Sequence, residues 1–198
     1  VVPPPVLASG RRTFGCFAQL YKLNAGVVQV FARILRQCPG ARLLLKAAAL
    51  ASEDQRAALR ASFAAQGVAA DALQMEGPEE HRVFLEAYGR IDIALETFPY
   101  GGATTATEAL WQGVPVLAFA GERWSARLAA TMLHHAGLDD WIAADADDLI
   151  ARAVALFHDP ATPQRLATLR VGLRDRLRAS AACDAAGFAR AMERAYAA

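Results

Sequence analysis

The segment Gly101-Gly102-Ala103-Thr104-Thr105 combines glycines and threonines directly ahead of a helical pattern. Glycines let a backbone approach a ligand closely, and the first turn of a helix offers free N–H groups at the positive end of its dipole. Two threonine hydroxyls add further donors, so the segment predicts an anion site suited to a phosphate. The run Thr105-Ala106-Thr107-Glu108 also fits a capping box, which would explain the same residues as a helix start alone.

Three further side chains could serve a nucleotide at such a site. Glu108, in the first turn of the same predicted helix, could accept two hydrogen bonds from a ribose diol or could cap the helix. Lys22 follows the first predicted strand and could neutralise a diphosphate as a compact charge, or it could be a solvated lysine. A cation near a helix start opposes the dipole, which favours the functional interpretation of Lys22. His81 opens another helix and could stack on a base or bond a ribose, or it could be an ordinary exposed histidine.

Several function classes are disfavoured by what the sequence lacks. It has neither a Gly-x-Gly-x-x-Gly fingerprint nor a Gly-Lys-Ser/Thr motif, which argues against a Rossmann oxidoreductase and a P-loop protein. Cys16, Cys38 and Cys183 are too sparse for a disulfide framework or a zinc site, so we expect a reducing compartment, the cytoplasm. The net charge of +1, with scattered basic residues, predicts no nucleic-acid surface. No apolar run reaches the roughly 18 residues of a membrane span.

Short apolar runs alternate with longer helical patterns along the chain. Strands are predicted at 13–18, 42–46, 73–76, 91–95 and 114–119, and helices between them at 24–37, 52–65, 78–88, 105–112 and 125–136. Nearly continuous apolar strands that alternate with helices predict an α/β fold: a Rossmann-like parallel sheet with helices on both faces. Ligands of such sheets bind outside the carboxyl ends of the strands, where the segments above lie.

We therefore divide the chain into three parts. Residues 1–12, rich in proline, are interpreted as a linker, and residues 13–144 as the Rossmann-like ligand-binding domain. Residues 145–198 are alanine- and arginine-rich and predict C-terminal helices that pack on the same lobe. The abrupt start suggests a fragment of a longer protein.

Five stretches together resemble a known family. They are 14–22 (Phe-Gly-Cys-Phe-Ala-Gln-Leu-Tyr-Lys), Glu79-Glu80-His81, 92–97, 104–116 and 121–130, in this order. In this order and spacing the chain resembles, over roughly residues 13–196, the C-terminal catalytic lobe of the O-linked N-acetylglucosamine (O-GlcNAc) transferases. The resemblance includes bacterial members that carry tetratricopeptide repeats.

The resemblance implies one lobe of a two-lobed GT-B glycosyltransferase that binds a UDP-sugar. It implies that Lys22 and the helix start at Gly102, Ala103, Thr104 and Thr105 hold the diphosphate, with help from Gln19. It further implies that Glu108 binds the ribose, that His81 lies against the uridine, and that neither a metal nor a cofactor takes part. The implied reaction is inverting transfer to Ser or Thr of a protein or peptide, with the general base and most of the acceptor site in an N-terminal lobe and repeats outside this chain.

The chain departs from the family pattern at three places. Familiar eukaryotic members have a histidine at the position of Ala103, an aspartate at that of Glu108, and a lysine shortly before Glu79 that is missing here. These differences leave the donor sugar open. A catalytically silent UDP-sugar-binding module, and a GT-B transferase with another sugar or a non-protein acceptor, remain as alternatives.

Overall fold

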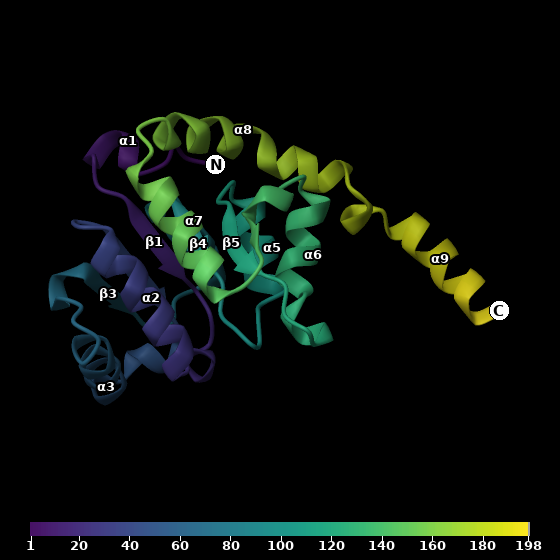
Figure 1. Ribbon diagram of the computed structural model, residues 1–198. Coiled ribbons are helices and arrows are strands. Elements are labelled where there is room, and N and C mark those ends of the chain that lie inside the picture. The colour runs from purple at the N-terminus through teal and green to yellow at the C-terminus, as the bar shows by residue number, and fades with distance from the viewer. Residues whose placement is uncertain (198) are drawn as a thin grey trace.

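The architecture is a six-stranded parallel sheet between two layers of helices (Figure 1). The computed structural model describes residues 1–197. The strands lie in the order β3-β2-β1-β4-β5-β6, and their bounds are β1 Thr13–Cys16, β2 Arg42–Lys46, β3 Leu73–Glu76, β4 Ile93–Leu95, β5 Val116–Phe119 and β6 Ile142–Ala143. The predicted fold class is confirmed. The sequence pattern missed β6 because its two residues, paired with Ala118 and Phe119, are too few to show a periodicity.

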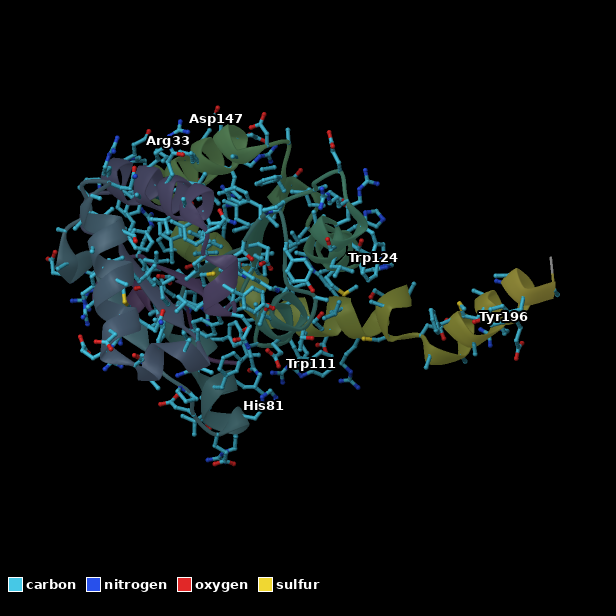
Figure 2. The ribbon with its side chains drawn as sticks, turned by 90° about the horizontal axis from the view of Figure 1, so that it is seen from below. Arg33, His81, Trp111, Trp124, Asp147 and Tyr196 are labelled. Carbon is cyan, nitrogen blue, oxygen red and sulfur yellow. The ribbon has the colours of Figure 1, made fainter. Side chains whose placement is uncertain are left out.

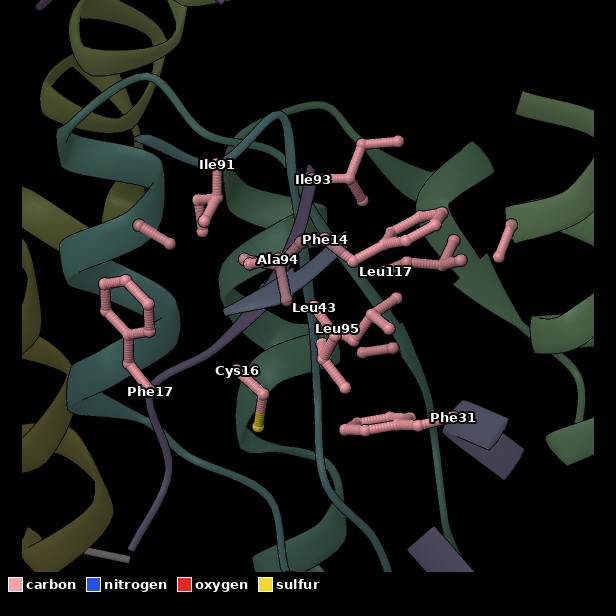
Figure 3. Packing of buried hydrophobic residues seen from close by; sticks show 14 of the residues in the cluster. Phe14, Cys16, Phe17, Phe31, Leu43, Ile91, Ile93, Ala94, Leu95 and Leu117 are labelled. Atoms are coloured by element: carbon pink, nitrogen blue, oxygen red, sulfur yellow. The ribbon is translucent and has the colours of Figure 1, made fainter. Parts of the chain in front are cut away.

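The strands are buried on both faces, as a parallel sheet requires. Leu43, Leu44 and Leu45 are successive residues of β2, and all three are buried although they point alternately to opposite faces. Figure 3 shows Phe31 packed on one side of the strands and Phe17 on the other. The apolar runs in the sequence therefore form the middle layer of one hydrophobic core.

Helices cover both faces of this sheet. α2 (Ala25–Gln37), α3 (Glu53–Ala64) and α7 (Ala146–His158) pack together on one face. α4 (His81–Glu86), α5 (Thr104–Trp111), α6 (Leu128–His135) and α8 (Thr162–Ala179) lie on the other. Figure 2 shows Arg33 of α2 and Asp147 of α7, which form a 2.7 Å ion pair, on the opposite side from His81 and Trp111. No helix within residues 1–197 is long and apolar enough to cross a membrane.

Residues 1–12, interpreted above as a linker, are folded onto the sheet. They contain the short helix α1 (Val6–Ser9), and the buried Asp92 holds them in place through hydrogen bonds. The Asp92 carboxylate accepts the backbone N–H of Val6 at 3.0 Å and that of Thr13 at 2.8 Å. Arg170 of α8 is also buried and donates to the carbonyl oxygens of Val2 and Ile91. The proline-rich composition of residues 1–12 did not predict this packing, because Asp92 and Arg170, which hold the segment, are distant in the sequence.

The C-terminal helices differ in how they pack. α7 packs on β5 and β6, and α8 packs on α5. α9 (Ala185–Ala197) instead extends away from the lobe (Figure 1), and no residue of this helix is buried. Its aromatic side chains Phe188 and Tyr196 are 67% and 82% exposed. The alanine- and arginine-rich composition predicted helices in this part of the chain, but it could not show that α9 is covered by nothing within the described residues.

Asn24 shows how a helix start also positions a loop near the carboxyl edge. Its Oδ1 accepts the N–H of Val27 at 3.1 Å and caps α2, while its Nδ2 donates to the carbonyl of Phe98 at 2.8 Å. We expect Asn24→Ala to lower the free energy of unfolding by about 1 to 2 kcal/mol, because the cap and the loop contact are lost together. Asn24→Asp keeps the cap acceptor and should retain most of that stability in urea denaturation. Equal losses in both variants would assign the effect to the Phe98 contact instead of the cap.

Candidate functional site

The carboxyl ends of β1, β2 and β3 surround a pocket of about 260 Å³. Its polar walls are Gln19, Lys46, Glu79, His81 and Thr105. Aromatic side chains from the same edge, together with alanines, a glycine and a proline, line the rest. Three residues singled out from the sequence, Gln19, His81 and Thr105, thus meet in one place although they come from three different loops or helix starts.

Lys22 lies beside the loop that precedes α5. It ends the 3-10 turn η1 (Leu20–Lys22), and its Nζ donates to the carbonyl oxygen of Gly101 at 3.0 Å. The ammonium also lies 4.3 Å from the centre of the Tyr100 ring. Among residues 1–197, no carboxylate lies within ion-pair distance of this nitrogen. The cation therefore retains donors that an anion at the start of α5 could use.

The start of α5 differs from the predicted capping box. The helix begins at Thr104, one residue earlier than expected, with Ala103 at the N-cap and no side chain bonded to its first amides. Glu108 consequently lies in the second turn, where its carboxylate is not a cap. The capping interpretation is wrong because Thr105 lies inside the helix and Ala103, which has no side-chain acceptor, is at the N-cap. Gly102 packs closely against this start, since a Cβ there would collide with Thr105 Oγ1. The first turn of α5 is left without a side-chain acceptor, as an anion site requires.

Glu96, which the sequence analysis did not single out, organises the loop between β4 and α5. Its buried carboxylate accepts the N–H of Thr97 at 2.8 Å and the Thr97 hydroxyl at 3.1 Å. Burial raises the pKa of Glu96, while these donors, the Gly102 amide and the charge of Lys22 act in the opposite direction. An acidic residue directly after a buried strand was the available signal. Its effect is to hold the loop that places Gly101 against Lys22.

His81 lines the pocket, and Glu108 lies beside it without lining the pocket itself. His81 Nε2 lies 3.7 Å from Glu108 Oε1, and the His81 side chain is 72% exposed while that of Glu108 is 18% exposed. Burial raises the pKa of Glu108, and the neighbouring His81 lowers it. The His81 ring is nearly parallel to that of Phe84, with 6.2 Å between the ring centres. An exposed ring beside a shielded carboxylate could serve a base and a ribose together.

Lys46 is a second lysine at this edge, and sequence reasoning placed it only as the end of a strand. Its side chain is 1% exposed, and its Nζ lies 2.6 Å from Glu79 Oε2 and 3.3 Å from Glu76 Oε2. A lysine that ends a run of three leucines was the signal for a buried charge.

Residues 1–197 contain no group of three or more His, Cys, Asp or Glu side chains that could hold a metal ion.

The family model of glycosyl transferase family 41 matches residues 7–192, nearly the whole chain. This chain belongs to glycosyl transferase family 41. The solved structure of a mutant Thermobaculum terrenum O-GlcNAc transferase superposes with a TM-score of 0.85 and 35% identity, over 93% of this chain and 35% of that one. The six-stranded parallel sheet and its two layers of helices are therefore an α/β GT-B-like lobe.

Curated relatives of this family 41 chain carry a name that refers to a UDP-sugar. The "probable UDP-N-acetylglucosamine--peptide N-acetylglucosaminyltransferase SPINDLY" of Arabidopsis thaliana is 34% identical, and that of Solanum lycopersicum is 32% identical; both matches cover 99% of this chain. The chain spans about a fifth (21%) of the length of these relatives. A structure of Anabaena HepE in complex with UDP and glucose has a TM-score of 0.60 over 88% of this chain and 46% of that one, and at 16% identity it supports the fold alone.

Proposed function

We propose that this chain is the nucleotide-sugar-binding lobe of an inverting glycosyltransferase. The enzyme transfers N-acetylglucosamine, or a related sugar, from a UDP-sugar to Ser or Thr of a protein or peptide. The observation that carries the proposal is the position of the Lys22 ammonium, 3.0 Å from the Gly101 carbonyl and next to the uncapped start of α5. A lysine and a helix N-terminus that converge in this way match the charge of a diphosphate.

In this proposal the lobe acts on the leaving group. The acceptor hydroxyl attacks the anomeric carbon, the bond to the β-phosphate oxygen breaks, and UDP departs with the bonding electrons. Negative charge therefore grows on the diphosphate, and Lys22 together with the amides of Thr104 and Thr105 offsets it. These groups supply the positive charge within the protein, so the proposed reaction needs no metal ion and no cofactor.

The nucleoside would lie along the pocket. The carboxylate of Glu108 is placed to accept the ribose hydroxyls, His81 to lie against the uridine, and Gln19 to assist at the phosphates. Gly102 and Ala103 leave the approach to the helix start free of large side chains.

The remaining parts of the reaction are assigned outside this chain. We propose that the general base and most of the acceptor site belong to a second Rossmann-like lobe and to tetratricopeptide repeats, and that neither nucleic acid nor a membrane takes part. The three cysteines, all free, agree with a reducing compartment such as the cytoplasm.

Calorimetric titration of the 198-residue chain tests the proposal. We expect UDP and UDP-N-acetylglucosamine to bind with similar affinity, because the lobe contacts mainly the nucleotide and diphosphate, and NAD to bind poorly. Binding of NAD without binding of UDP would contradict the proposal and would favour a dinucleotide-binding protein.

The ribose role of Glu108 can be separated from any role in folding. We expect Glu108→Ala to weaken UDP binding about tenfold, because a hydrogen bond to a charged acceptor contributes roughly 1.5 kcal/mol. The same variant should bind 2′,3′-dideoxy-UDP as wild type does, since that ligand has no ribose hydroxyls to offer. Calorimetry with both ligands gives the comparison, and Glu193→Ala on the exposed α9 is the control for loss of one acidic side chain. An equal loss of affinity for UDP and for 2′,3′-dideoxy-UDP would show that Glu108 does not bind the ribose hydroxyls.

A further inference from the structure

Lysine is rare in this chain, and both lysines lie at the carboxyl edge of the sheet. Of 21 cationic side chains, only Lys22 and Lys46 are lysines, and the others are arginines. A lysine provides a compact charge with three rotatable donors, whereas an arginine provides a planar fork. Lys22 is assigned to the diphosphate, which leaves a buried lysine in the pocket wall without a function.

The contacts of Lys46 indicate that its principal partner is Glu79. Glu76 already receives two hydrogen bonds from the guanidinium of Arg90, one of them at 2.7 Å. The Lys46 ammonium is displaced toward Glu79, at 2.6 Å compared with 3.3 Å for Glu76. Glu79 is in the loop after β3, and its side chain is 42% exposed. Lys46 and Glu79 therefore form a donor–acceptor pair, held together by charge, on the pocket wall.

The strand order places this pair at the end of the pocket away from the diphosphate. Lys22 follows β1, and the start of α5 follows β4, the neighbour of β1 in the sheet. Lys46 ends β2 and Glu79 follows β3, which lie on the other side of β1. A nucleotide with its diphosphate at the β1–β4 side and its ribose near Glu108 would extend its base toward β2 and β3.

We propose that the Lys46–Glu79 pair recognises a keto base, in which an exocyclic carbonyl lies next to a ring N–H. Lys46 donates to the carbonyl oxygen, and Glu79 accepts the ring N–H. Uracil and guanine both present this edge. Cytosine and adenine present an amino group and a bare ring nitrogen there, so that donor would face donor and acceptor would face acceptor. The inference rests on the proposed function, because it assumes a nucleoside diphosphate in this pocket.

The pairing of Lys46 with Glu79 explains how two charged side chains can be available to bind a base. A buried ammonium without a partner is strongly unfavourable, so Lys46 needs a carboxylate when the pocket is empty. Glu79 supplies it and remains half exposed, with one oxygen free of any contact to Lys46. The pair is thus oriented before the base arrives, and little side-chain entropy is lost on binding.

The test is base discrimination, measured by calorimetry with UDP, GDP, CDP and ADP. We expect the wild-type chain to bind UDP, GDP or both at least about tenfold more tightly than CDP and ADP, the range of one good bidentate base contact. The UDP and GDP measurements show which keto base fits the pocket. Lys46→Met keeps the length of the side chain but removes its charge. In this variant the affinities for the keto-base ligands and for CDP and ADP should differ by no more than about threefold.

Two further variants keep the result interpretable. Glu79→Gln changes only the exposed partner and should reduce the same discrimination even if Lys46→Met fails to fold. Lys22→Ala should weaken all four ligands alike, because it acts on the diphosphate. Equal binding of all four ligands by wild type, or unchanged discrimination in a folded Lys46→Met or in Glu79→Gln, would overturn the inference and leave the proposed function intact. Failure of all four ligands to bind would contradict the proposed function itself.

Discussion

Replacing Lys22 by alanine should weaken UDP binding by about ten- to a hundredfold while changing the stability of the chain little. A hydrogen bond from a charged donor to an anion contributes roughly 1.5 to 3 kcal/mol, which corresponds to this range of affinity. The ammonium contacts the Gly101 carbonyl and the Tyr100 ring and forms no ion pair within residues 1–197. Its charge lowers the pKa of the buried Glu96, but that carboxylate keeps its two hydrogen bonds from Thr97 when Lys22 is removed. Calorimetric titration with UDP and urea denaturation measure the two quantities.

Two controls define what the Lys22 result means. Lys22→Arg keeps the charge but changes its geometry and should recover part of the lost affinity. Arg33→Ala removes a cation on the opposite face of the sheet and should leave UDP binding unchanged (Figure 2). Wild-type affinity in Lys22→Ala would remove the physical basis of the transferase assignment.

The largest loss of stability is expected at Asp92. Its side chain is buried and accepts the N–H groups of Val6 and Thr13, and its charge acts on the buried guanidinium of Arg170 without a direct ion pair. Burial lowers the pKa of Arg170 to about 10, and Asp92 counteracts that effect. Asp92→Ala would leave two buried N–H groups without an acceptor and would remove the charge that favours the buried Arg170 guanidinium, so the free energy of unfolding should fall by about 3 to 5 kcal/mol. Urea denaturation at neutral pH gives the value.

A double-mutant cycle distinguishes the effect of the Asp92 charge on Arg170 from the hydrogen bonds of Asp92 to the backbone. Arg170→Met removes the stranded cation, so the double variant should be more stable than Asp92→Ala alone. Asp147→Ala, which breaks an exposed ion pair, should cost less than about 1 kcal/mol and serves as the control. A loss below about 1 kcal/mol in Asp92→Ala would show that the N-terminal segment is not held by this carboxylate.

The sheet could be predicted from the sequence because each strand is an almost continuous apolar run. In β2, three leucines in succession fit a strand buried on both faces and fit a surface strand poorly. The loops of the site were predicted for a related reason: glycines and threonines directly after a buried strand fall at the carboxyl edge. Their contribution to binding stays a prediction until the titrations above are made.

What could not be predicted depends on contacts between distant residues. Asp92 and Arg170 are separated by 78 positions, and neither has a local pattern that predicts its buried contact with the N-terminal segment. Lys46 and Glu79 meet only because β2 and β3 are neighbours in the sheet. The capping box failed because the helix begins at Thr104 with Ala103 as its N-cap, which places Thr105 inside the helix and Glu108 in its second turn.

The central place of β1 affects the order in which the chain can fold. Residues 13–76 contain β1, β2 and β3 and could assemble first, which would leave the second edge of β1 exposed until β4 arrives. An exposed strand edge can pair with another chain, so such an intermediate would be prone to aggregation. Asp92 directly precedes β4 and binds the N–H of Thr13, so the step that covers this edge also anchors the beginning of β1.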